Sequence, residues 1–131
     1  MVLFFLWTAG ILYGSLTPGD SLPRVGWLSK IPQFDKIVHF GFYLGQVALL
    51  ILWLRPSRGN RLWIALAAIA FSGVIELLQG EYCDRSADWL DLAANSAGAL
   101  TGIPLAALLG KIERGVSSRK QSEGGNQKSN I

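Results

Sequence analysis

The chain has few of the residues that cross-link proteins or bind metals through sulfur. It contains one cysteine, Cys83, and one histidine, His39, among 131 residues. A single cysteine excludes an intrachain disulfide, and a metal site built on several thiolates would need partners that the sequence lacks. A free thiol and a bridge to another molecule both stay open for Cys83.

Charge is also scarce, at 16% of residues, and it is nearly absent from the middle of four apolar runs. These runs are Val2–Leu16, Phe34–Leu54, Leu62–Leu78 and Trp89–Leu109. At about 1.5 Å per helical residue, the second and fourth runs match a hydrocarbon core of about 30 Å, whereas the third and first are shorter. Residues 47–54 and 64–71 offer no polar face for a soluble bundle. We therefore predict an all-α integral membrane bundle of four transmembrane helices, with the lipid bilayer as its surroundings.

The cations are unevenly divided around these runs. Eight of the 12 lysines and arginines lie in residues 55–61 and 111–131, on the side that would hold both termini after four crossings. The positive-inside rule then places both termini in the cytoplasm. The same division explains the pI of about 9.3 without a nucleic-acid partner. No lysine or arginine precedes Arg24, so we expect a retained first helix and not a cleaved signal peptide.

Composition divides the chain into two parts. Residues 1–110 hold the four runs and form the predicted transmembrane domain. Residues 111–131 are rich in Gly, Ser, Gln, Asn and Lys, which is typical of disorder. We predict a disordered basic cytoplasmic tail there, with no chemistry of its own.

Polar residues near the outer ends of three runs recur at helical spacing and so share narrow faces. These stripes are Asp35, His39, Tyr43 and Gln46; Ser72, Glu76 and Gln79; and Asp88, Asp91 and Asn95, which continue into Gly98 and Gly102. Four crossings would bring the three stripes to one side of the membrane, and we predict that they meet in one outward-facing pocket. Asp35 and Asp88 could be helix-capping acids, whereas Glu76 lies where the helix dipole opposes an acid.

Three glycine pairs have the GxxxG spacing that lets helix backbones approach closely. They are Gly10 with Gly14, Gly41 with Gly45, and Gly98 with Gly102. The third pair shares a side with Asp91 and Asn95, which favours a packed face there. Such pairs serve contacts within one bundle or a homo-oligomer equally well. Pro104 predicts a bend in the last run.

Three motifs in this order resemble the VanZ-like family of membrane proteins. They are Asp35-Lys36-Ile37-Val38-His39-Phe40, the run from Gly73 to Gln79 around Glu76, and the run from Arg85 to Asn95 followed by Gly98. The resemblance covers residues 10–109 and includes Ser15-Leu16-Thr17-Pro18. It implies a protein of the bacterial cell (inner) membrane that acts on the envelope. The family takes its name from a member that raises resistance to the glycopeptide teicoplanin, but the resemblance supplies no reaction.

Three functions stay open on these residues, and whether the protein is an enzyme stays open with them. As an enzyme, it would use His39, Glu76, Asp88 and Asp91 as catalytic groups, and Asp35, Lys36, Gln79, Arg85 and Asn95 to bind a lipid-linked or lipid headgroup substrate. The same four catalytic candidates could hold a divalent metal, although their spacing matches no established metal motif. Alternatively, the pocket binds an envelope ligand or assists membrane assembly without turnover. A proton or ion pathway is the third option, weakened because the inner halves of the runs lack ionisable residues.

Overall fold

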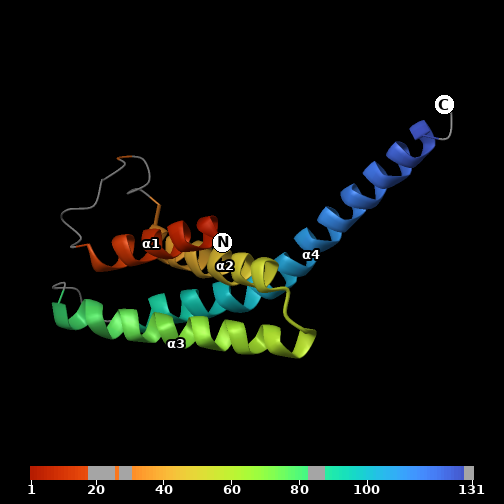
Figure 1. Cartoon of the computed structure of the whole chain (residues 1–131). Helices are drawn as coiled ribbons and strands as arrows, with labels where there is room; N and C mark the ends of the chain where they lie inside the picture. Colours follow the sequence, from red (N-terminus) through yellow and green to blue (C-terminus); the bar gives the residue numbers. More distant parts are fainter. Residues whose placement is uncertain (18–25, 27–30, 83–87, 129–131) are drawn as a thin grey trace.

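The computed structural model describes residues 1–17, 26, 31–82 and 88–128. Within these residues it contains four α-helices and no strand: α1 (Val2–Leu16), α2 (Phe34–Leu54), α3 (Arg58–Tyr82) and α4 (Trp89–Lys128), arranged as in Figure 1. Helices α2, α3 and α4 are long and apolar enough to cross a membrane, and α1 is a shorter apolar helix. The all-α prediction is confirmed. Four crossings and the orientation of the termini stay predictions.

The ends of α2 follow from its flanking residues. Gln33 and Arg55 adopt left-handed backbone conformations, with φ of 57° and 48°, and these conformations interrupt the helix on both sides. The bounds of α1 and α2 are those expected from the apolar runs. Helix α3 extends four residues beyond its run at each end. Glu76 therefore lies six residues before the end of α3, so its burial, and not an opposing dipole at the helix terminus, is what makes it unusual.

Helix α4 differs most from expectation. It continues through residue 128, so residues 111–128 are helical where the sequence suggested a disordered tail. Once a helix is nucleated, each further residue adds a hydrogen bond at little cost, and the start of this extension is tied to α2 by an ion pair of 3.0 Å between Arg55 and Glu113. Figure 1 shows the last part of α4 extending away from the other helices. Pro104 lies inside this helix, where a proline removes a backbone hydrogen bond and favours a bend.

The closest packing in the bundle joins α2 to α4 through Gly98 and Gly102. A Cβ atom on Gly98 would collide with the carbonyl oxygen of Phe40, and one on Gly102 would lie 2.8 Å from the carbonyl oxygen of Leu44. This GxxxG pair is therefore a contact within the chain. Neither Gly10 nor Gly41 has another group within 4 Å of that position.

The interior is small and the exterior is apolar. Ile11, Tyr43, Val47 and Ala99 are almost completely buried. Many large apolar side chains, such as those of Leu66, Leu77 and Leu100, remain exposed on the outer faces of α3 and α4. Exposed faces of this kind are suited to acyl chains. A homo-oligomer stays a prediction.

We expect Gly98→Ala to destabilise the bundle by about 1–3 kcal/mol, because its new methyl group would push α4 away from α2. The matched control is Gly41→Ala, which places the same methyl group in open space on α2. The measurement is thermal unfolding of both variants in the same detergent. An equal Tm for the two variants would show that the α2–α4 contact does not limit stability.

Candidate functional site

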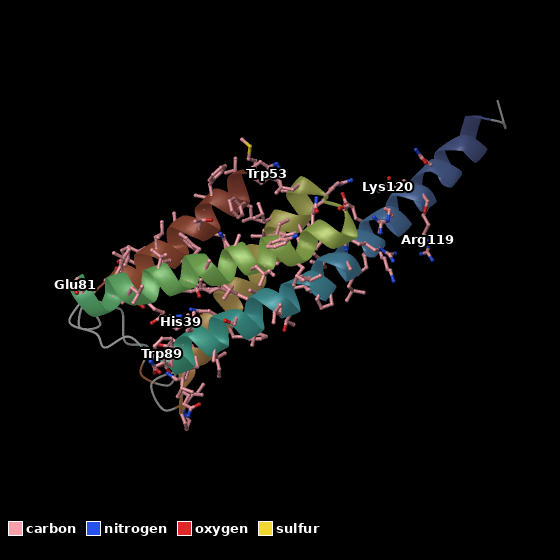
Figure 2. All side chains as sticks on the ribbon, turned by 90° about the horizontal axis from the view of Figure 1, so that it is seen from below. His39, Trp53, Glu81, Trp89, Arg119 and Lys120 are labelled. Atoms are coloured by element: carbon pink, nitrogen blue, oxygen red, sulfur yellow. The ribbon has the colours of Figure 1, made fainter. Side chains whose placement is uncertain are left out.

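The polar stripes meet at one end of the bundle. Figure 2 shows His39 and Trp89 at the end where α3 reaches Glu81, and Trp53, Arg119 and Lys120 toward the opposite end. The cluster is formed by Lys36 and His39 of α2, Glu76 of α3, Asp88, and Asp91 and Asn95 of α4. We call these six residues the polar cluster.

Lys36 connects the start of α2 to the start of α4. Its ammonium lies 2.8 Å from Asp35, 2.9 Å from Asp88 and 2.9 Å from Asp91. The Lys36 ammonium holds the pKa of the Asp88 carboxyl below its usual range. Asp88 also caps α4, since its Oδ1 accepts a hydrogen bond of 2.8 Å from the backbone N–H of Leu90. An anionic headgroup could reach Lys36 only by displacing a carboxylate.

His39 is buried between two residues of α4. Its Nδ1 lies 3.1 Å from Oδ1 of Asn95, and its Nε2 lies 3.7 Å from Oδ2 of Asp91. An amide oxygen only accepts hydrogen bonds, so Nδ1 must carry the proton in this contact. In a neutral imidazole, Nε2 then presents its lone pair toward Asp91.

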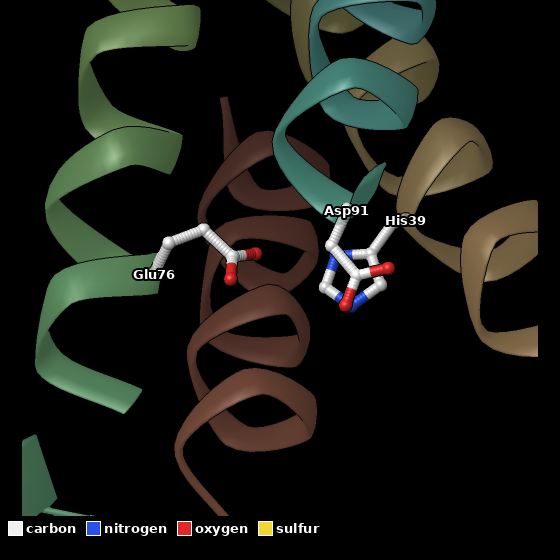
Figure 3. A group of neighbouring side chains, drawn as sticks. All are labelled: His39, Glu76 and Asp91. Atoms are coloured by element: carbon white, nitrogen blue, oxygen red, sulfur yellow. The ribbon is translucent and has the colours of Figure 1, made fainter. Parts of the chain in front are cut away.

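Glu76 completes the centre of the cluster from α3. It is 6% exposed, and its Oε1 has no hydrogen-bond partner among the described residues. Figure 3 shows its carboxylate directed toward His39 and Asp91. One ligand atom from each of these three residues lies within 4.8 Å of the others, so together they could hold a metal ion.

The remaining candidates have other surroundings. Gln79 is buried, and its Nε2 donates to the carbonyl oxygen of Ser15, which ties α3 to α1. Asp35 shares the sequence stripe of His39, yet its side chain is 48% exposed and contacts Lys36. Arg85 lies outside the described residues, as does Cys83.

Tyr43 is a candidate that the sequence reasoning did not select. It lies one turn beyond His39 on the same stripe, it is 1% exposed, and its hydroxyl has no hydrogen-bond partner in the part of the chain that the structure describes. Its position in the stripe was visible in the sequence. A tyrosine in an apolar helix is usually a packing residue, so the sequence held no signal that its hydroxyl would be left unpaired.

An apolar cavity of about 310 Å³ opens beside Glu76, between α3 and the start of α4. Its walls are Ala70, Gly73, Val74, Leu77, Trp89 and Leu92, and its polar lining comes from Glu76 and Asp88. The cavity therefore offers a hydrocarbon surface that ends at a carboxylate. An amphiphile, with an apolar chain and a polar head, would match both the apolar walls and the carboxylate.

The fold and the cluster define a helical membrane protein with ionisable groups buried at one end of its bundle. The model of the VanZ/LLP1 family matches residues 2–110, and the chain belongs to this family. Comparison with curated proteins and with solved structures found no match. The family membership confirms the resemblance drawn from the three motifs.

We expect Lys36→Gln to lower the Tm by roughly 5 °C or more, because it leaves three neighbouring carboxylates without their cation. Lys120→Gln, on the exposed extension of α4, is the control and should leave the Tm unchanged. The measurement is thermal unfolding in detergent at neutral pH. An equal Tm for both variants would mean that solvent, and not Lys36, balances these acids.

Proposed function

We propose that this protein belongs to the bacterial inner membrane and takes the headgroup of an amphiphilic lipid into the polar cluster. The acyl chain would lie in the cavity between α3 and α4. A phospholipid or a lipid-linked precursor of the cell wall has the required form, and action on such a precursor is what would connect the protein with glycopeptide resistance. The observation that carries the proposal is the buried, unpaired Oε1 of Glu76 at the edge of an apolar cavity.

The free energy lost by leaving Oε1 of Glu76 without a hydrogen bond is the first argument for a bound headgroup. A buried acceptor without a donor costs about 1–3 kcal/mol, more when it is charged. A hydroxyl or amine of a headgroup would donate to Oε1 and remove this cost. The neighbouring walls, which include Gly73, Val74 and Leu77, are apolar and would receive hydrocarbon without desolvating any polar group.

The arrangement around His39 supports chemistry as well as binding. Its Nε2 lies 3.7 Å from Oδ2 of Asp91 in the same group of side chains as Glu76, where it could accept a proton from a headgroup hydroxyl or from water. Asn95 holds the other ring nitrogen and so keeps the imidazole in one orientation. The same pocket without turnover is the alternative, a binding protein for an envelope ligand.

The distribution of charge supports an outward-facing pocket. The end of the bundle opposite the polar cluster carries Arg55, Arg58, Arg61, Lys111 and Arg114, which line a second cavity. Under the positive-inside rule, that end and both termini would lie in the cytoplasm. The polar cluster would then face the outer leaflet.

We expect Glu76→Gln to reduce the lipid that copurifies with the protein by tenfold or more, since a hydrogen bond to a charged group contributes about 1.5–3 kcal/mol. Glu81→Gln is the matched control, because Glu81 is an exposed acid on the same helix. The measurement is native mass spectrometry of protein extracted from its own membrane. Equal lipid content in both variants would contradict a headgroup at Glu76.

The cavity has its own test in Gly73→Leu. The position has no other group within 4 Å, so the new side chain should fill the cavity without disturbing the helix. We expect this variant to lose bound lipid while keeping the wild-type Tm. Gly41→Leu, on α2 and away from the cavity, is the control. Full lipid retention by Gly73→Leu would exclude the cavity as the acyl site.

The orientation can be tested through the single cysteine. Cys83 lies in the segment that joins α3 to α4, on the side of the polar cluster in the proposed topology. We expect a membrane-impermeant maleimide to label it in intact spheroplasts, and Cys83→Ser to abolish the signal. Labelling only after lysis would place the pocket in the cytoplasm and remove an outer-leaflet substrate.

A further inference from the structure

We propose that His39, Glu76 and Asp91 form a binding site for one divalent transition-metal ion, of which Zn²⁺ is the expected occupant. The proposal deepens the proposed function, since it names a cofactor for the same pocket, and with the ion bound the lone pair of His39 Nε2 would go to the metal in place of a proton. It does not depend on which lipid enters the pocket. It rests on the three ligand atoms that lie within 4.8 Å of one another, all from buried residues. It also rests on Glu76, whose Oε1 is unpaired and whose carboxylate is directed toward His39 and Asp91 (Figure 3).

The distance between His39 and Asp91 favours a metal over a direct bond. At 3.7 Å, Nε2 and Oδ2 are too far apart for a hydrogen bond. Two ligands of one zinc ion, each with a bond of about 2.0–2.1 Å in tetrahedral geometry, lie about 3.4 Å apart. This pair therefore requires only a small closure around an ion, whereas the group of three, whose ligand atoms lie within 4.8 Å of one another, must contract further.

The neighbouring contacts orient each ligand for this role. Nδ1 of His39 bonds Asn95, which leaves Nε2 as the coordinating atom, as in metal sites where the second ring nitrogen is held by an oxygen. Lys36 binds Oδ1 of Asp91 at 2.9 Å, which leaves Oδ2 for the ion. No described side chain competes for Oε1 of Glu76.

Charge and ligand type select the class of ion. Two carboxylates and a neutral imidazole carry two negative charges, which a divalent cation balances. One nitrogen and two hard oxygens suit Zn²⁺ or Mn²⁺ better than soft Cu⁺, and the nitrogen disfavours Mg²⁺ and Ca²⁺. Three protein ligands leave a position open for water or for an oxygen of a headgroup, as in catalytic zinc sites. Alternatively, a protonated His39 could pair with the neighbouring carboxylates, and no ion would then be needed. The titration described next distinguishes this arrangement from a metal site.

The test is a Zn²⁺ titration of the full chain, purified in detergent, stripped with a chelator and freed of lipid. We expect saturation at one equivalent, a rise in Tm with Zn²⁺, and no competition from equimolar Mg²⁺. Glu76→Gln and Asp91→Asn, which keep side-chain size, should each weaken binding tenfold or more. Asn95→Ala should weaken it by about 10–100-fold. Glu81→Gln should bind as the wild type does.

Two outcomes would overturn the inference. One is the absence of saturable Zn²⁺ binding to the wild-type chain, which requires no variant to fold. The other is unchanged Zn²⁺ affinity in Glu76→Gln and Asp91→Asn. Loss of lipid in Gly73→Leu, together with no Zn²⁺ binding to the wild type, would reject the metal and leave the lipid proposal standing. If the wild type binds Zn²⁺ while Gly73→Leu and Glu76→Gln keep their lipid content, the lipid proposal is rejected and the metal site stands.

Discussion

Gly98 and Gly102 bring the backbone of α4 against that of α2, and the positions of the polar groups depend on this contact. A side chain at either glycine would separate the two helices. With the helices this close, His39 reaches Asn95, which is 56 residues away in the chain, and Lys36 reaches Asp91. The small-residue pair that packs the bundle is therefore also what assembles its polar end.

Burying the charged and polar side chains of the polar cluster costs desolvation free energy. The contacts around some of these side chains offset that cost, and those around others do not. Lys36 is neutralised by three carboxylates and Asp88 caps α4, so this part of the cluster is stable without a ligand. Oε1 of Glu76 and the hydroxyl of Tyr43 are buried and, among the described residues, unpaired. Buried polar groups without a partner are uncommon in folded proteins, and those in membrane-spanning helices often belong to functional sites. The unevenness separates an outer part whose charges are paired from a centre that holds the unpaired atoms of Glu76 and Tyr43.

The two ends of the bundle differ in chemistry. One end holds the histidine and the acids of the polar cluster, and the other holds four arginines and Lys111, which line a cavity between α2, α3 and α4 together with Glu113. The extension of α4 projects from the basic end, and its side chains as far as Gln121 are exposed (Figure 1). Such asymmetry suits a protein whose pocket and whose anchoring charges face opposite leaflets.

Spacing and composition were enough to predict four apolar helices and the family. The bounds of α1 and α2, the stripe of Ser72, Glu76 and Gln79, and the three motifs could all be read from spacing, since helical periodicity is a local property. The sequence did not predict the helical extension to Lys128, because exposed segments of that composition carry no packing signal. Which polar residues come into contact could not be predicted from spacing and became clear from the packing of the helices. In the folded chain Asp35 is exposed, Gln79 donates a hydrogen bond to the carbonyl oxygen of Ser15, and Glu76 lies close to His39. Such contacts depend on how closely helices from distant parts of the chain approach one another.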